Sequence, residues 1–226
     1  MARLKQQAAD KAVEFAQSGM VLGLGEGSTA LLAVRRIGEL VQAGTLTGVI
    51  GIPASERMRA EAERLGIPLT TLAEHPVIDL TIDGADEVDP HLNLIKGGGG
   101  ALLREKIVAQ ATRREIIIVD DSKMVQQLGT NWAIPVEVIP FGWQSQAAYL
   151  ESLGAVVTQR QRDGAVYQTD QGNYILDCNF GPISDPYTLG AQIKSRTGIV
   201  EHGLFLNLAT DVIVASPDGI RHIERG

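Results

Sequence analysis

Short apolar runs alternate with helix-like segments through much of the chain. Apolar residues recur at helical spacing between 8 and 16, and further helical segments extend to Leu40 and over 55–65. Runs typical of buried strands lie at 20–24, 48–52, 80–82, 115–120 and 211–215. Strands that alternate with helices in this order predict an α/β fold, a Rossmann-like parallel sheet with helices on both faces.

Beyond Gly129 the pattern changes to strand-like and helix-like segments in the order β-α-β-β-α-β. The strand-like runs are 136–139, 155–161, 174–180 and the residues from 199 onward, and the helix-like segments are 144–153 and 186–194. This order is typical of a small split-βαβ, ferredoxin-like α+β domain. We therefore expect a main α/β catalytic domain of residues 1–130 and 206–226, with residues 131–205 inserted as the small domain.

Composition and charge argue against several classes of protein. The net charge of -7, with no run rich in lysine and arginine, argues against a nucleic-acid partner. Cys178 is the only cysteine, so a disulfide framework within the chain is excluded. Residues 1–19 predict an amphipathic helix with acids rather than a signal peptide, and no apolar run approaches the ~18 residues of a membrane span. We expect a cytoplasmic protein without a membrane partner.

A glycine-rich turn follows the first predicted strand. Residues 23–29 read Gly-Leu-Gly-Glu-Gly-Ser-Thr, and a helix follows them. Strand, glycine turn and helix N-terminus form an arrangement that binds phosphate on backbone amides, while Ser28 and Thr29 equally suit plain helix caps. A dinucleotide site is less well supported, because Ser28 replaces the last glycine of that motif and no acid follows the second strand. A sugar phosphate is the better match.

Most of the remaining candidate catalytic and binding residues lie in the stretch 79–106. Asp83 and Asp86 follow an apolar strand, Lys96 precedes four consecutive glycines, and Glu105 lies in the helix after them. Glycines let backbone N–H groups approach a ligand closely, so this loop suits an anion or an oxyanion. The two aspartates equally suit a cap and a turn. A calcium loop is excluded, because Ala85 occupies a position that requires an oxygen ligand.

Glu105 and two lysines are the candidate reactive groups. The helix neighbours of Glu105 at three and four residues are apolar, which tends to raise the pKa of a carboxyl and suits a general base. The alternative is a solvated glutamate between Arg104 and Lys106. Lys96 and Lys123 follow predicted strands, where an anion site and an ordinary surface lysine are both possible. The four histidines lack metal-binding spacing, so we expect no metal site.

The segment IDGADEVDPHLNLIKGGGGALLREKIVA, residues 82–109, resembles the signature of ribose-5-phosphate isomerase, A type, and the similarity continues along most of the chain. The resemblance implies interconversion of D-ribose 5-phosphate and D-ribulose 5-phosphate, with Glu105 as the proton acceptor. It also implies a sugar-phosphate substrate, no metal or redox cofactor, and a homodimer or larger homo-oligomer.

Carried over by position, the resemblance implies catalytic roles for Glu105, Lys96, Asp83 and Asp86. The implied substrate-binding residues are Lys5, Gly25, Glu26, Gly27, Ser28, Thr29, Asp83, Gly84, Ala85, Asp86, Lys96, Gly97, Gly98, Gly99 and Lys123.

Glu26 departs from the family, which usually has threonine or serine between these two glycines. An acid that points into the loop would repel phosphate and weaken binding, unless it turns to solvent or to a basic neighbour such as Lys5.

Two other classes remain open. A sugar-phosphate-sensing effector domain would share the fold, but is normally fused to a helix-turn-helix, whereas one helix is predicted before Met20. A CoA transferase on a related fold would use a glutamate nucleophile, but lacks the 96–100 loop in this form.

Overall fold

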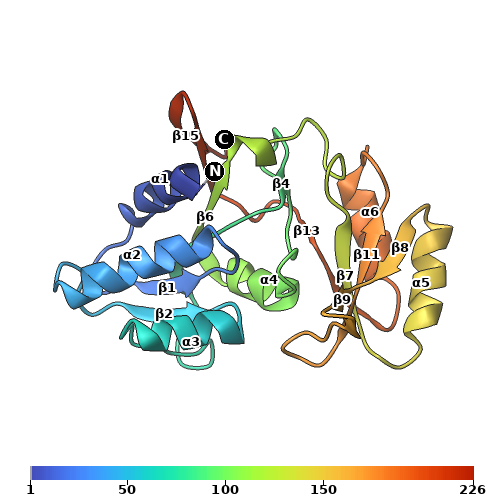
Figure 1. The fold of residues 1–226 in the computed structure, drawn as a ribbon, viewed down its shortest axis with the longest axis horizontal. Coiled ribbons are helices and arrows are strands. Elements are labelled where there is room, and N and C mark those ends of the chain that lie inside the picture. The colour runs from blue at the N-terminus through green and yellow to red at the C-terminus, as the bar shows by residue number, and fades with distance from the viewer. Residues whose placement is uncertain (1) are drawn as a thin grey trace. The chain divides into compact units, whose positions relative to one another are not determined.

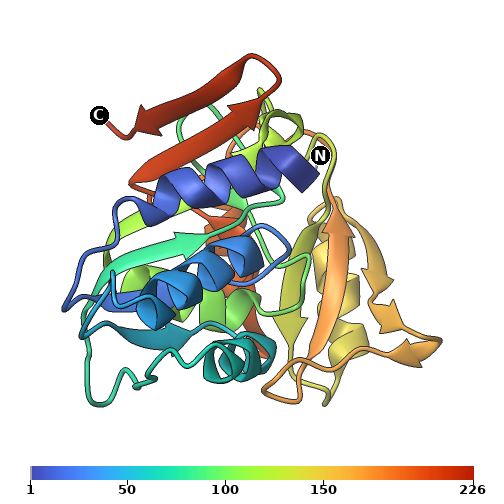
Figure 2. The same ribbon diagram turned by 60° about the vertical axis from the view of Figure 1, so that its left-hand side comes forward.

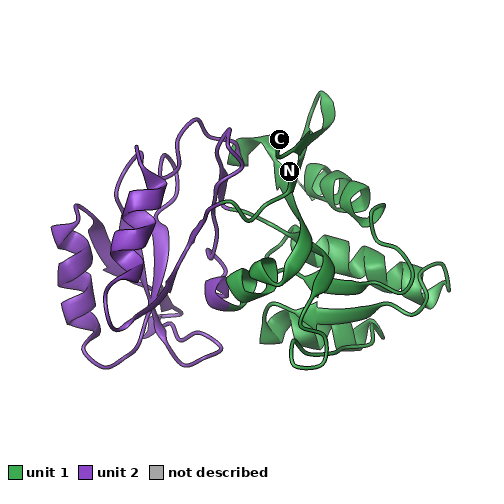
Figure 3. Cartoon of the chain, turned by 180° about the vertical axis from the view of Figure 1, so that it is seen from behind, with its two compact units in different colours: residues 1–85, 104–123, 207–226 green, residues 86–103, 124–206 purple. Residues whose placement is uncertain are grey.

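The computed structural model describes residues 2–226, which divide into two compact units (Figure 3). The described part of unit 1 comprises 2–85, 104–123 and 207–226, and unit 2 comprises 86–103 and 124–206. Unit 2 therefore takes in the glycine loop and residues 124–130, in addition to the expected insertion. The physical reason is a small sheet in which β5 (Leu94–Ile95) pairs with both β4 (Glu87–Val88) and β13 (Leu204–Phe205), so the glycine loop is tied to the inserted segment.

Unit 1 is built on a sheet with strand order β15-β14-β6-β3-β1-β2. Its strands are β1 (Val21–Leu24), β2 (Ile50–Pro53), β3 (Ile78–Asp83), β6 (Thr112–Asp120), β14 (Asp211–Ser216) and β15 (Gly219–Glu224). All neighbouring pairs are parallel except β14 with β15, which form a hairpin beside the first helix (Figure 2). The predicted parallel α/β sheet is confirmed. Because the parallel strands share one direction, their carboxyl ends lie at one edge, where ligands bind in folds of this kind.

Helices cover both faces of this sheet (Figure 1). They are α1 (Ala2–Val13), α2 (Ala30–Gln42), α3 (Glu56–Arg64) and α4 (Leu102–Gln110), with a short 3-10 helix η1 (Asp121–Lys123). Apolar side chains of α1, α2 and α3 share a buried core with Leu22, Leu24 and Ile116 of the sheet. Val108 of α4 joins a second cluster with Ile52 and Ile78. The first two residues of α4 belong to unit 2 and the rest to unit 1.

Unit 2 contains an antiparallel sheet with strand order β12-β7-β11-β8. Its elements in chain order are β7 (Ile134–Val138), α5 (Trp143–Ser152), β8 (Val156–Gln159), β11 (Tyr174–Asn179), α6 (Pro186–Lys194) and β12 (Ile199–His202). The expected β-α-β-β-α-β order is therefore present. A small hairpin, β9 (Gln161–Arg162) with β10 (Ala165–Val166), turns at Asp163 and Gly164, which both have positive φ. Positive φ at both central residues is characteristic of a type I′ hairpin turn.

Within residues 2–226, none of the helices combines the length and apolar character that crossing a bilayer requires.

Candidate functional site

The predicted phosphate loop, Gly25 to Thr29, joins β1 to α2 in unit 1. Gly27 has φ +107°, a conformation that glycine adopts readily, and the carbonyl oxygen of Gly27 accepts the first helical hydrogen bond from Leu31 N at 3.0 Å. Thr29 occupies the N-cap position, but its side chain makes no capping hydrogen bond. The backbone amides at the start of α2 therefore lack a side-chain cap from this residue, as suits a site that presents N–H groups to an anion.

Asp83, at the end of β3, holds this loop in place. Its Oδ1 atom accepts hydrogen bonds from the backbone N of Glu26 at 3.0 Å and of Gly84 at 2.7 Å. A β-carbon at position 25 would lie 2.4 Å from Asp83 Cγ, so only glycine fits there. The structure thus brings Asp83 together with the phosphate loop, through the parallel pairing of β1 with β3.

Lys5 of α1 reaches the same loop, where its Nζ atom donates to Ser28 Oγ at 2.9 Å. The Glu26 carboxylate, only 7% exposed, accepts hydrogen bonds from Ser55 Oγ and Arg57 Nη2 at the start of α3. This matches the alternative in which Glu26 turns to a basic neighbour, with Arg57 in the place of Lys5. Sequence pattern alone did not single out Arg57, because the fourth residue after a strand, in a charge-rich helix, is an ordinary position for a surface arginine.

Glu105 lies in the first turn of α4 and is 4% exposed. The alternative of a solvated glutamate is therefore wrong, and the adjacent Lys106 is buried as well. Arg104, which precedes Glu105 in the chain, donates a hydrogen bond from Nη1 to Glu56 Oε1 of α3 at 2.6 Å, and this hydrogen bond lowers the pKa of Glu56. A first-turn position also brings the Glu105 carboxylate near the positive end of the helix dipole.

Lys123 closes η1, directly after β6, at the same carboxyl edge of the unit 1 sheet as the phosphate loop and Asp83. Asp120 fixes this turn, because its Oδ1 atom accepts hydrogen bonds from the backbone N of Ser122 at 3.1 Å and from the Ser122 hydroxyl. The side chain of Lys123 is partly exposed.

The glycine loop, Lys96 to Gly100, belongs to unit 2. Lys96 is 1% exposed, and its Nζ atom lies 5.4 Å from the centre of the Phe205 ring, so the surface alternative for this lysine is wrong. Its backbone N donates to Gly203 O at 2.9 Å. Gly97 and Gly100 have φ of +99° and +95°, which explains why glycine is needed at both positions.

Asp86 holds the glycine loop as Asp83 holds the phosphate loop. Its Oδ2 atom accepts a hydrogen bond from Gly98 N at 2.8 Å. The two aspartates, separated in the chain by Gly84 and Ala85, are therefore attached to different loops. A β-carbon at Gly98 would lie 3.0 Å from Trp132, and one at Gly100 would lie 2.2 Å from the Tyr167 hydroxyl. Trp132 and Tyr167 border the loop, although neither stood out in the sequence.

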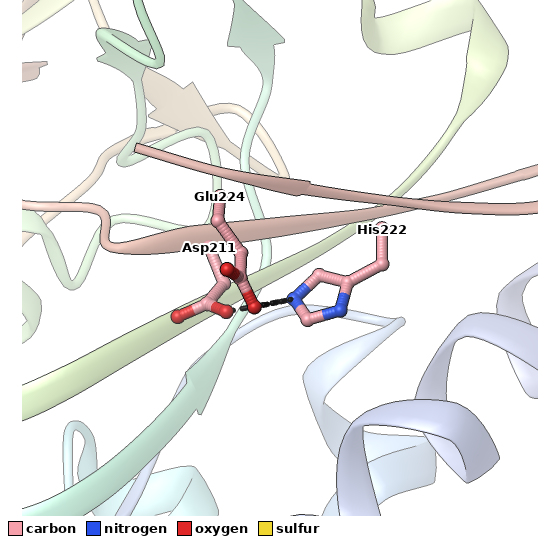
Figure 4. Close-up of side chains that lie close together, drawn as sticks. All are labelled: Asp211, His222 and Glu224. Atoms are coloured by element: carbon pink, nitrogen blue, oxygen red, sulfur yellow. Dashed lines mark hydrogen bonds and ion pairs between the residues drawn. The ribbon is translucent and has the colours of Figure 1, made fainter. Parts of the chain in front are cut away.

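A group with metal-ligand chemistry lies elsewhere in unit 1, on the β14–β15 hairpin (Figure 4). Asp211, His222 and Glu224 each offer a ligand atom, and these atoms all lie within 4.8 Å of one another. Arg114 makes two hydrogen bonds to the Asp211 carboxylate, at 2.7 and 3.0 Å, and His222 Nε2 lies 2.7 Å from Asp211 Oδ1. Because a guanidinium already neutralises Asp211, the cluster is better described as an ion-pair network than as a metal site.

Comparisons with known proteins agree on one family. The model of the family "ribose 5-phosphate isomerase A (phosphoriboisomerase A)" matches residues 50–219. The chain is 57% identical to a ribose-5-phosphate isomerase A of Chloroflexus aurantiacus, over 97% of this chain and 92% of the relative. It is 51% identical to a probable ribose-5-phosphate isomerase 2 of Arabidopsis thaliana, over 96% of this chain and 85% of the relative.

Solved structures give the same result. A ribose 5-phosphate isomerase from Plasmodium falciparum superposes with a TM-score of 0.96 at 42% identity, and the match covers 99% of both chains. A D-ribose-5-phosphate isomerase solved in complex with phospho-erythronic acid also reaches a TM-score of 0.96, at 36% identity, over 99% of this chain and 98% of that one.

Proposed function

The chain belongs to the ribose 5-phosphate isomerase A family and is an aldose–ketose isomerase, and from this premise we propose how its residues share the reaction. The reaction interconverts D-ribose 5-phosphate and D-ribulose 5-phosphate through an enediolate, with Glu105 as the general base. Family membership favours this function over a sugar-phosphate sensor or a CoA transferase.

The phosphate group binds to the loop from Gly25 to Thr29. Backbone N–H groups at the start of α2 and the positive end of its dipole attract the anion. Lys5, which already contacts Ser28, and Lys123, which ends the turn after β6, supply positive charge. Glu26 does not oppose this charge as a bare anion, because Arg57 pairs with it.

The opened sugar is held by residues 83–86 and by the glycine loop. Asp83 and Asp86 assist ring opening and the proton transfers between hydroxyl oxygens, and Gly84 and Ala85 contribute backbone contacts. In the Lys96–Gly99 segment, the backbone N–H groups of Gly97 and Gly99 bind sugar oxygens, since those of Lys96 and Gly98 donate to Gly203 O and Asp86. Each aspartate anchors a glycine-containing loop, so its carboxylate position is fixed before the substrate binds.

Proton transfer starts at Glu105. Its carboxylate removes the proton from C2 of the open-chain aldose, and the electron pair forms the C1–C2 double bond while the C1 carbonyl oxygen becomes negative. The proton then returns from Glu105 to C1, and the O2 hydroxyl proton passes to the negative O1, so that a C2 carbonyl and a C1 hydroxyl group form. No metal or redox cofactor is required, because oxidation at C2 and reduction at C1 occur within one molecule.

Lys96 and the amides of the glycine loop stabilise the oxyanion of the enediolate. Fixed donors directed at developing charge usually make the largest catalytic contribution, and they are worth more where water is excluded. Lys96 is suited to this because its side chain is buried. We also propose a homodimeric, cytoplasmic enzyme, and light scattering after size exclusion tests the dimer.

The observation that carries the proposal is the burial of Glu105 at the helix that directly follows four glycines. Glu105→Gln keeps the shape of the side chain and removes the base, so kcat should fall by roughly 10²-fold or more with little change in KM. The matched control is Glu63→Gln, the same change at an exposed position of α3, which should leave both constants unchanged. A Glu105→Gln enzyme with near-normal kcat would remove Glu105 from the mechanism.

A further inference from the structure

A largely buried arginine of the inserted segment makes hydrogen bonds to the backbone of the glycine loop. Arg160 lies between β8 and β9, and its side chain is only 13% exposed. Its Nη1 atom donates hydrogen bonds to two successive carbonyl oxygens, those of Gly97 at 2.9 Å and Gly98 at 3.2 Å. A single guanidinium nitrogen thus fixes two adjacent peptide groups of the loop.

Asp177 holds the other side of this guanidinium. Nε of Arg160 donates to Asp177 Oδ2 at 2.9 Å, and Nη2 donates to Oδ1 of the same carboxylate. Asp177 lies on β11, a central strand of the unit 2 sheet, so the pair is anchored to a rigid element. Bidentate pairs of this kind restrict the orientation of the guanidinium plane as well as its position.

The orientation of the carbonyls decides where the amides point. In a trans peptide the N–H and C=O bonds are antiparallel, so the N–H groups of Gly98 and Gly99 point away from Arg160. The Gly98 N–H meets Asp86 Oδ2 at 2.8 Å on that opposite side. A positive charge at the carbonyl oxygens also polarises both peptide groups, which strengthens their N–H groups as donors.

We infer that Arg160, held by Asp177, is a positioning residue of the isomerase reaction. It sets the two peptide groups so that the Gly98 N–H stays on Asp86 and the Gly99 N–H is directed at the enediolate oxyanion before the substrate arrives. This rests on the proposed function of the loop and adds the device that orients it. Arg160 itself does not touch the substrate.

The test compares Arg160→Met and Arg160→Lys with Arg196→Met as the matched control. Arg196 is also a partly buried arginine of unit 2 with side-chain hydrogen bonds, but these go to Gln146 and Ser145 rather than to the glycine loop. Circular dichroism and thermal unfolding show which variants are folded. Arg160→Met should lower kcat by about 10- to 100-fold, the lower part of the range for lost oxyanion donors, while KM changes by less than about threefold.

Arg160→Lys should recover little, because an ammonium cannot span one carboxylate and two carbonyls. Guanidinium ion added to Arg160→Ala should restore part of kcat, whereas ammonium at the same ionic strength should not. A four-carbon phosphorylated aldonate, whose carboxylate resembles the enediolate, should bind Arg160→Met more weakly by the same factor as kcat falls. Inorganic phosphate should bind equally well to the wild type and to Arg160→Met.

The outcomes separate this inference from the proposed function. A wild-type enzyme without isomerase activity would remove the proposed function. An active wild type with a folded Arg160→Met variant of unchanged kcat would overturn only the role of Arg160. A loss that Arg196→Met reproduces, or that guanidinium ion fails to restore, would assign Arg160 a purely structural role and overturn the inference as well.

Discussion

Replacing Asp211 with asparagine removes the centre of the ion-pair network on the β14–β15 hairpin. The carboxylate is almost fully buried and accepts hydrogen bonds from Arg114, from the Thr210 hydroxyl at 2.6 Å, and from His222 in the tautomer that donates from Nε2. Burial alone raises the pKa of Asp211, but the hydrogen bonds from these three residues outweigh burial and lower the pKa from 3.8 to about 2. We expect Asp211→Asn to destabilise unit 1 near neutral pH.

The size of the effect follows from this difference in pKa. A pKa difference of one corresponds to about 1.4 kcal/mol, so the ionised carboxylate contributes about 2 kcal/mol to the free energy of unfolding at pH 7. Because the folded pKa lies below the unfolded one, the contribution is complete above pH ~5 and is lost as the pH falls toward 2. About half of this contribution should remain at pH 3, by the same relation.

Urea unfolding of wild type and Asp211→Asn at pH 7, 4 and 3 measures this directly. The difference in the free energy of unfolding should be about 2 kcal/mol at pH 7 and about half as large at pH 3. The control is Glu224→Gln, an exposed acid 3.8 Å from Arg114, which should cost less than about 0.5 kcal/mol. A difference that does not change with pH would refute the reasoning. Stabilisation of the wild type by Zn²⁺ or Mn²⁺, absent in Asp211→Asn, would show a metal site instead.

Two further predictions concern the substrate. Lys96→Ala should lower kcat/KM by the equivalent of about 2–4 kcal/mol, and Lys96→Arg should recover only part of this loss. Steady-state kinetics measure both effects. Equal activity of the wild type and the two variants would mean that Lys96 has only a structural role. Glu26→Thr leaves Arg57 as an uncompensated cation near the phosphate loop, so KM should fall several-fold at low salt and less at high salt. Adding Arg57→Ala should return KM to within about twofold of wild type, whereas an equal fall in both variants would mean that Arg57 does not neutralise Glu26.

Several short elements escaped prediction because they depend on distant partners. β4, β5 and β13 contain two residues each, and they are strands only because 94–95 pair with both 87–88 and 204–205. The start of β7 was also missed, since Pro135 cannot donate to a strand ladder and usually marks a boundary. Here the Pro135 carbonyl accepts a hydrogen bond from Gly203 N at 2.7 Å, and the neighbouring strand β12 contains a register shift.

The sequence by itself determined the parallel sheet, the two glycine-containing loops and the place of Glu105, the residue that we propose as the base. Apolar runs and glycines are local signals, and β1 or the 97–100 loop can be recognised from a few adjacent residues. Only the tertiary structure decided which side chains hold these loops. The contact between Arg160 and Gly97 spans 63 positions, and that between Arg57 and Glu26 spans 31. Such contacts depend on which strands and helices become neighbours in space. The sequence around a single charged residue in a polar segment therefore does not indicate which distant residue it will contact.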